Sequence, residues 1–255
     1  MRTEFPSGKR RDITRTGVFK THTGCSSSCV YCPDADTGVS FRDIKDVISD
    51  IRSLIKEGYE DFVATDPEFN EELEYALEFC EELNKSGIKI KWSAFMKPAN
   101  YNRKLLRLMK NTGVDLIRLK IDSFKKCPLY WTDTEKLVFI AKSCGIRLKI
   151  DLVTGFPYED EELLTWCIDL LRRIQPYKVN INCFIKLYNS SQLTKIIKND
   201  PELKKNLIGN TEDPEFKKPV FYNRISIEQL IKLIDNDRIF TIVRPEPLLS
   251  DHTKK

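Results

Sequence analysis

Short apolar runs alternate with amphipathic helical segments along most of this 255-residue chain. A strand, a helix and a second parallel strand of one sheet join by a right-handed crossover, so the alternation predicts a parallel sheet. The runs are apolar enough for helices to cover both faces of that sheet. Strands are expected at 17–23, 61–65, 88–95, 115–121, 146–153 and 179–187. Helices are expected at 41–57, 70–86, 101–112, 134–143 and 159–174, and three of them end before a glycine, Gly87, Gly113 or Gly145.

Six β-α units are too few to close an eight-fold barrel. The predicted fold class is therefore α/β, an open partial TIM-type barrel of six β-α units over residues 17–190. Residues 1–16 form an N-terminal arm in this prediction, and residues 191–255 form a short C-terminal extension. The extension is expected to contain a loop at 199–219, a helix at 226–235 and an edge strand at 239–243. Active-site residues of such barrels follow the C-terminal ends of the strands.

Three of the eight cysteines follow the first predicted strand, in Cys25-Ser26-Ser27-Ser28-Cys29-Val30-Tyr31-Cys32. Three thiolates can hold a four-iron four-sulfur cluster and leave one iron open to a substrate or cofactor. Zinc is the alternative, because closely spaced cysteines in a cytosolic chain usually bind metal. Zinc prefers a fourth ligand nearby. His22 precedes the loop by only three residues and His252 lies in a polar tail, so both are poor candidates.

This spacing resembles the CxxxCxxC loop of the radical S-adenosylmethionine (SAM) superfamily, including the aromatic residue before the last cysteine, here Tyr31. The resemblance implies that Cys25, Cys29 and Cys32 bind a 4Fe-4S cluster and that SAM chelates the open iron. One electron, from a reductant protein such as flavodoxin or ferredoxin, would then release a 5'-deoxyadenosyl radical. That radical would abstract hydrogen from a peptide or small-molecule substrate.

The resemblance extends to other segments that hold the cofactor. Asp66 or Glu68, after the second strand, would receive the SAM ammonium, although the usual Gly-Gly-Glu is absent there. These residues also precede a helix and can instead serve as its entry. After the fourth strand, Lys120 would bind the SAM carboxylate, and Asp122 or Ser123 the ribose; Lys120 and Asp122 share one face of the strand.

The fifth strand leads into 150–159, which resembles the segment that packs against adenine. Gly155 would allow a close approach of that ring. Asp151 replaces the first glycine of the usual pattern, so a polar side chain is expected in the pocket. Within the superfamily, residues 79–83, 90–93 and 105–109 most resemble the catalytic half of cobalamin-linked members. The short arm before the first strand leaves no room for a cobalamin domain, so cobalamin chemistry is a minor expectation.

Redox-neutral outcomes need a hydrogen donor, commonly a thiol. Cys127 and Cys183 are the two catalytic candidates, and packing is the alternative for each, since free cysteine is often buried. Cys80, Cys144 and Cys167 lie on predicted helices or their ends and are expected to be structural.

The net charge of +4, from 42 basic and 38 acidic residues, is too balanced to favour nucleic acid as a partner. No stretch reaches the roughly 18 apolar residues of a membrane span, and the scattered cysteines do not suggest disulfides, so a cytoplasmic protein is expected. Two other functions stay open. One is a non-catalytic iron-sulfur or SAM-binding protein, and the other is a zinc-stabilised binding protein.

Overall fold

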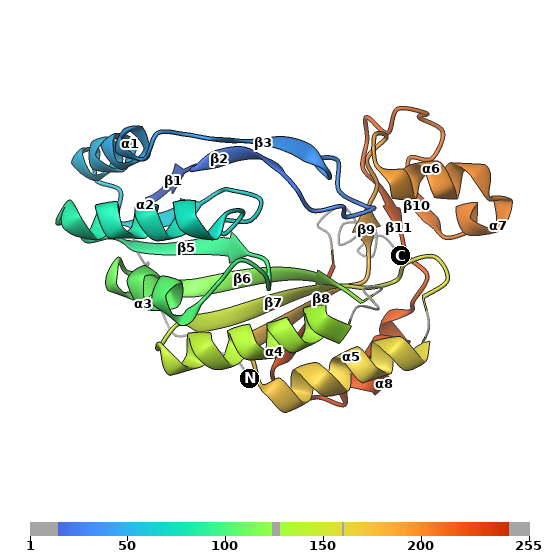
Figure 1. Ribbon diagram of the computed structural model, residues 1–255. Helices are drawn as coiled ribbons and strands as arrows, with labels where there is room; N and C mark the ends of the chain where they lie inside the picture. Colours follow the sequence, from blue (N-terminus) through green and yellow to red (C-terminus); the bar gives the residue numbers. More distant parts are fainter. Residues whose placement is uncertain (1–14, 124–127, 160, 245–255) are drawn as a thin grey trace, which may run out of the picture.

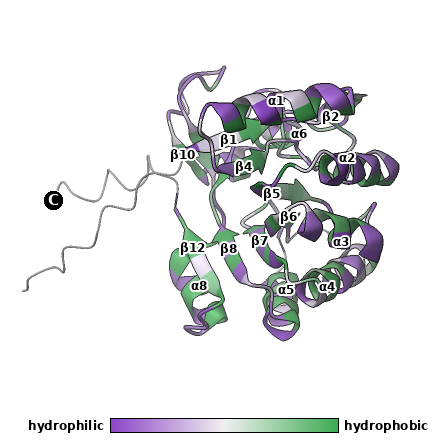
Figure 2. Ribbon diagram, turned by 90° about the vertical axis from the view of Figure 1, so that its left-hand side faces the viewer, coloured by the Kyte–Doolittle hydropathy of each residue, from purple (hydrophilic) through white to green (hydrophobic). Residues whose placement is uncertain are grey.

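A seven-stranded parallel sheet forms the frame of the molecule. The computed structural model describes residues 15–123, 128–159 and 161–244. The strand order is β1-β4-β5-β6-β7-β8-β12, and each neighbouring pair is parallel. The sheet curves into an arc with β1 and β12 at its two ends (Figure 2), so the predicted open partial barrel is confirmed. The strands are β1 Thr16–Phe19, β4 Asp61–Ala64, β5 Lys91–Met96, β6 Val114–Asp122, β7 Arg147–Val153, β8 Lys178–Asn182 and β12 Phe240–Val243.

Helices cover the outer face of this sheet (Figure 1). They are α1 Ile44–Lys56, α2 Leu73–Lys85, α3 Arg103–Asn111, α4 Pro128–Ser143, α5 Glu161–Ile174 and α8 Ile227–Ile234. Their apolar sides bury a core that includes Phe79, Trp92 and Leu105. The expectation of helices on both faces is wrong, because the inner face of the central strands carries polar side chains that stay at least partly exposed, such as Lys120 on β6 and Lys149 and Asp151 on β7. No helix among the described residues is long and apolar enough to cross a membrane.

The first predicted strand, 17–23, is two strands. β1 ends at Phe19, and β2, His22–Cys25, pairs antiparallel with β3, Thr37–Phe41. The break is caused by a residue more than 40 positions away in the sequence. The Asp66 carboxylate accepts hydrogen bonds from the backbone amides of Thr21 and His22 at 2.7 and 3.0 Å, so these amides are not available to continue β1. The predicted helix at 41–57 correspondingly begins only at Ile44, with Asp43 as its N-cap.

The last predicted strand, 179–187, is also broken. β8 stays in the large sheet, while β9, Ile185–Lys186, joins β10, Leu207–Gly209, and β11, Val220–Tyr222, in a small antiparallel sheet. The expected loop at 199–219 contains α7, Pro201–Lys204, and β10, so that expectation is wrong in part. Asp200 nucleates α7 by accepting the amides of Glu202 and Leu203. The helix and edge strand expected near the C-terminus are present as α8 and β12.

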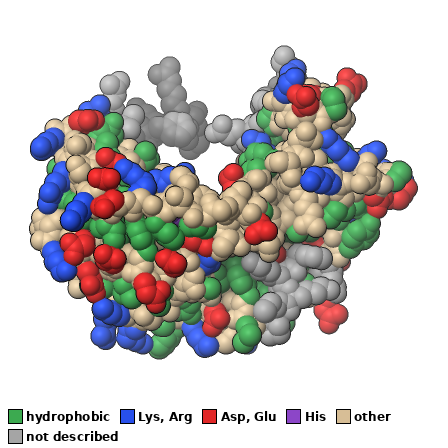
Figure 3. Space-filling model, turned by 45° about the horizontal axis from the view of Figure 1, so that its top comes forward, with side chains coloured by type: hydrophobic (Ala, Val, Ile, Leu, Met, Phe, Trp, Pro, Cys, Tyr) green, Lys and Arg blue, Asp and Glu red, His purple; other side chains and the backbone are tan. Residues whose placement is uncertain are grey.

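The segment after β9 packs against the cysteine loop. A second apolar cluster, distinct from the main core, joins Tyr31 and Phe156 to Leu193 and Ile197 of helix α6, Gln192–Asn199. The amide of Leu193 also donates to the carbonyl of Val30 at 2.8 Å. Residues more than 150 positions apart in sequence thus fix the loop over the C-terminal ends of the strands. The surface is hollowed between the part with α1 and α2 and the part with α6 and α7 (Figure 3).

Candidate active site

The three clustered cysteines lie on one loop that starts where β2 ends. Cys25 is 6% exposed, and its amide donates to Thr37 Oγ1 on β3 at 3.0 Å. Cys29 and Cys32 are half-buried, and the amide of Cys32 donates to the carbonyl of Cys29 at 3.0 Å. Burial raises the pKa of the Cys25 thiol. A thiolate at this position therefore needs a compensating positive charge, which a bound metal supplies.

The donor set fits a cluster better than a single ion. Within residues 15–123, 128–159 and 161–244, the ligand atoms that converge within 4.8 Å are those of Cys25, Glu68 and Glu71, without Cys29 or Cys32. A zinc ion requires all its ligands around one point, whereas each cysteine of an iron-sulfur cluster binds a different iron. The three thiols therefore do not share one point as ligands of a single ion would, and a four-iron cluster does not require them to.

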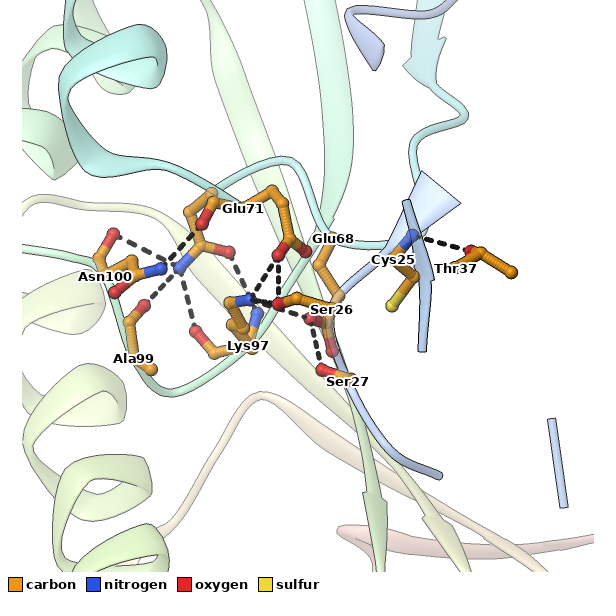
Figure 4. A network of polar contacts seen from close by, with 10 residues as sticks. Cys25, Ser26, Ser27, Thr37, Glu68, Glu71, Lys97, Ala99 and Asn100 are labelled. Atoms are coloured by element: carbon orange, nitrogen blue, oxygen red, sulfur yellow. Dashed lines mark hydrogen bonds and ion pairs between the residues drawn. The ribbon is translucent and has the colours of Figure 1, made fainter. Parts of the chain in front are cut away.

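Two carboxylates from the segment after β4 and a lysine after β5 anchor the cysteine loop (Figure 4). Lys97, directly after β5, lies 3.0 Å from Glu71 Oε1 and 3.4 Å from Glu68 Oε2. Ser27 of the loop donates to Glu68 at 2.8 Å, and Ser26 donates to Glu71. Burial alone would raise the pKa of Glu71, but the hydrogen bonds from Ser26 and Lys97 outweigh it and lower the pKa. This loop-anchoring network, Ser26, Ser27, Glu68, Glu71 and Lys97, holds two carboxylates beside Cys25.

The two acidic candidates after β4 lie in different surroundings. Glu68 belongs to the loop-anchoring network, and its side chain is 19% exposed. Asp66 is 1% exposed and points into the fold, where Oδ1 accepts two backbone amides and lies 3.5 Å from Nδ1 of His22. Burial lowers the pKa of His22, although Asp66 opposes that effect. Asp66 therefore has a structural task, and Glu68 is the candidate that faces the loop.

Lys120 and Tyr31, two of the candidate cofactor-binding residues, lie together. Lys120 Nζ lies 5.1 Å from the centre of the Tyr31 ring, and this ring lies 5.6 Å from that of Phe156. Burial raises the pKa of Tyr31, so its hydroxyl stays protonated. Asp122 shares the inner face of β6 with Lys120 and is half-buried. A cation, a carboxylate and two aromatic rings thus converge where the cysteine loop meets β6 and the segment after β7.

Ser123 and Gly155 are joined by a half-buried residue, Glu159, that the sequence alone did not single out. Glu159 accepts the hydroxyl of Ser123 and, at 2.5 Å, the amide of Gly155. Burial raises the pKa of Glu159, although these hydrogen bonds oppose it. The Ser123 hydroxyl is therefore engaged within the protein. Gly155 has φ +86°, and a Cβ there would lie 2.9 Å from the carbonyl oxygen of Cys183, so the turn needs glycine.

Asp151 lies on the inner face of β7, beside Lys149. Its carboxylate is 3.4 Å from Lys149 Nζ and accepts a hydrogen bond from Asn180 at 2.9 Å. Cys183 is fully buried, and burial raises its pKa to about 11, which favours packing over contact with a substrate. Cys127 lies outside the described residues. Cys80 and Cys167 are fully buried on outer helices, as expected of structural cysteines.

Comparisons with curated proteins give distant relatives, and no protein-family model matches the chain. The tRNA-2-methylthio-N(6)-dimethylallyladenosine synthase of Finegoldia magna is 25% identical over 187 residues, which are 65% of this chain and 40% of that protein. The tryptophan 2-C-methyltransferase of Streptomyces laurentii is 23% identical over 70% of this chain and 34% of its own length. An uncharacterised methyltransferase of Pyrococcus horikoshii is 24% identical over 92% of this chain and 53% of its own length. The chain thus spans about half or less of these relatives.

Solved structures give the fold. The radical SAM methyltransferase TsrM of Kitasatospora setae, solved with cobalamin and a [4Fe-4S] cluster, superposes with a TM-score of 0.77 at 18% identity, over 92% of this chain and 56% of TsrM. Coproporphyrinogen III oxidase of Escherichia coli, also a radical SAM enzyme, has a TM-score of 0.50 at 11% identity, over 85% of this chain and 57% of that one. The resemblance predicted from the cysteine spacing is confirmed, and the chain has the fold of the radical SAM enzymes.

Proposed function

We propose that this protein is a radical SAM enzyme in which Cys25, Cys29 and Cys32 hold a 4Fe-4S cluster. The observation that carries the proposal is the position of the three-cysteine loop over the C-terminal ends of a parallel partial barrel, the edge where such folds hold their active sites. When bound, the cluster would supply one electron for cleavage of SAM to methionine and a 5'-deoxyadenosyl radical, and that radical would abstract hydrogen from the substrate. The reductant, a flavodoxin or ferredoxin, the cytoplasmic location and the peptide or small-molecule substrate belong to the same proposal.

The chain's own residues divide the work of holding SAM. Glu68, on the rim of the cysteine loop, accepts the ammonium group, and Lys120 faces the carboxylate. The segment around Gly155 packs against adenine in this proposal, and the missing Cβ lets its turn lie close to the Cys183 carbonyl oxygen. Phe156 packs behind Tyr31 and excludes water from this side. Glu159 positions the Gly155 turn through the amide hydrogen bond and does not itself need to touch SAM.

The test is the product of SAM cleavage. Anaerobically reconstituted protein is mixed with SAM and dithionite, and 5'-deoxyadenosine is followed by mass spectrometry. Cys29→Ala is the inactivating variant, and Cys144→Ala, at the end of α4, is the matched control. The proposal expects 5'-deoxyadenosine from the wild type and Cys144→Ala and none from Cys29→Ala. Equal amounts from all three proteins, or none from protein with an intact cluster, would overturn it.

One observation favours a second function, a non-catalytic cluster protein. Glu68 is already engaged by Ser27 and Lys97, so its carboxylate must be shared if an ammonium group is to bind. A protein that only carries electrons binds no ammonium group, so its Glu68 can keep Ser27 and Lys97 as its partners. Equilibrium binding of SAM to the reconstituted protein separates the two functions, because an electron carrier would not bind it.

A further inference from the structure

A row of cations crosses the inner face of the sheet. In the strand register, Arg118 of β6 lies beside Lys149 of β7, which lies beside Lys178 of β8. Residues paired in this way point to the same face, and adjacent strands are about 4.8 Å apart. Like charges directly opposite one another destabilise a sheet. The row therefore needs anionic compensation.

Among the described residues, Lys149 and Lys178 have partners for their charges and Arg118 does not. Lys149 pairs with Asp151 at 3.4 Å, and Lys178 donates to the carbonyl of Arg238 at 3.3 Å. Arg118 has no ion pair within residues 15–123, 128–159 and 161–244, and its buried Nε has no hydrogen-bond partner. Its guanidinium instead lies 5.5 Å from the centre of the Phe95 ring. Arg118 is thus a partly buried cation that stacks on a ring, and no described residue accepts a hydrogen bond from its Nε.

Arg118 also lies at a useful distance from the candidate site. It precedes Lys120 by two residues on the same face of β6, which places it about 6.6 Å further from the cysteine loop. A planar guanidinium presents paired N–H donors that match a carboxylate or a phosphate. A small molecule held there by its anionic group would extend along β6 toward Lys120 and the loop.

We propose that Arg118, supported by Lys149, binds the carboxylate or phosphate group of a small-molecule substrate on the inner face of the sheet. The identification of the bound molecule as a substrate rests on the proposed function, whereas the anion site itself does not depend on it. SAM also carries a carboxylate, which a guanidinium could bind in the same way. The experiment must therefore distinguish a substrate group from the cofactor.

Calorimetric titration of the cluster-loaded full chain with inorganic phosphate, and separately with acetate, tests the site without any turnover. Arg118→Met removes the charge and keeps an apolar stem against Phe95. Arg107→Met makes the same change at an exposed position on α3 and is the matched control. Wild type and Arg107→Met are expected to bind at least one probe, and Arg118→Met should weaken that binding roughly ten- to a hundredfold. Equal binding by both variants, or no binding of either probe to the wild type, would overturn the site.

Two further results complete the test. Arg118→Lys, which keeps the charge without the planar fork, should bind the probe with intermediate strength, so a misfolded Arg118→Met would not leave the question open. Saturating SAM should leave probe binding unchanged, whereas competition by SAM would assign Arg118 to the cofactor and overturn the substrate inference. If 5'-deoxyadenosine forms but neither probe binds, the anion site is refuted and the proposed function stands. If the probe binds through Arg118 but no 5'-deoxyadenosine forms, the proposed function is refuted and the anion site stands.

Discussion

Lys97→Met should reveal how strongly the loop-anchoring network is stabilised by its only cation. The side chains of Lys97, Glu68 and Glu71 are 13, 19 and 5% exposed. Removing one partner from a buried ion pair costs about 3–5 kcal/mol, because the other charge stays buried and uncompensated. Partial exposure of Lys97 and Glu68 lowers that value, so we expect a loss of about 3 kcal/mol in the free energy of unfolding. For a chain of this length, the thermal midpoint should fall by about 6–12 °C.

Urea unfolding of the cluster-free chain under reducing conditions measures this loss. Lys104→Met is the matched control, because Lys104 forms an ion pair of 2.7 Å with Glu81 on the exposed surface, where such pairs contribute less than about 1 kcal/mol. Adding Glu71→Gln to Lys97→Met removes one orphaned charge and should restore part of the loss. Equal losses in Lys97→Met and Lys104→Met would refute the assignment of a buried, coupled network.

Three other substitutions test separate parts of the account. Gly155→Ala forces a Cβ into a backbone with φ +86° and within 2.9 Å of the Cys183 carbonyl oxygen; unfolding should become easier by about 2 kcal/mol, and equilibrium binding of SAM should weaken. Because burial raises the pKa of Glu159, its stabilising contribution is present below the unfolded pKa of about 4.3 and is lost as pH rises through the folded pKa. Glu159→Gln should therefore gain stability relative to wild type as pH rises above about 4, and a pH-independent difference in unfolding free energy would contradict this sign. Leu106→Ala, at a fully buried position of α3, should cost about 2–5 kcal/mol while the iron content per chain stays unchanged, and loss of iron would show that the core and the loop are coupled.

The sequence was sufficient for the repeating part of the fold. The spacing of apolar residues predicts the helices, and the glycines after α2, α3 and α4 predict where those helices end. Gly113, for example, has φ +100°, and a Cβ there would collide with the carbonyl oxygen of Ile90. The alternation of strands and helices then allows few topologies, because parallel crossovers are right-handed. The open parallel arc follows from these rules.

The sequence was not sufficient where a distant partner decides the structure. The break between β1 and β2 depends on Asp66, and the pairing of β2 with β3 spans the whole cysteine loop. β9 leaves the main sheet because it pairs with β11, more than 30 residues later. Runs such as 17–23 and 179–187 are continuous in composition, so no local signal marks the point where each strand changes partner.

The same reason explains what was found and missed in the candidate site. Cys25, Cys29 and Cys32 form a short motif and need no folded context to be selected. Lys97 and Glu71 lie 26 residues apart on different loops and meet only because β4 and β5 are neighbours in the sheet. A lysine directly after an apolar strand was the available signal for Lys97, since the end of a parallel strand is where functional side chains gather.

The central claim is that the three cysteines hold a four-iron cluster with one iron open to SAM. Iron and sulfide analysis combined with electron paramagnetic resonance of the reduced, anaerobic protein tests it most directly. The account predicts about four irons and four sulfides per chain, a reduced-cluster signal that SAM alters, and loss of both in the variant with Cys25, Cys29 and Cys32 all changed to alanine. Zinc in place of iron, or a cluster signal that SAM leaves unchanged, would contradict it.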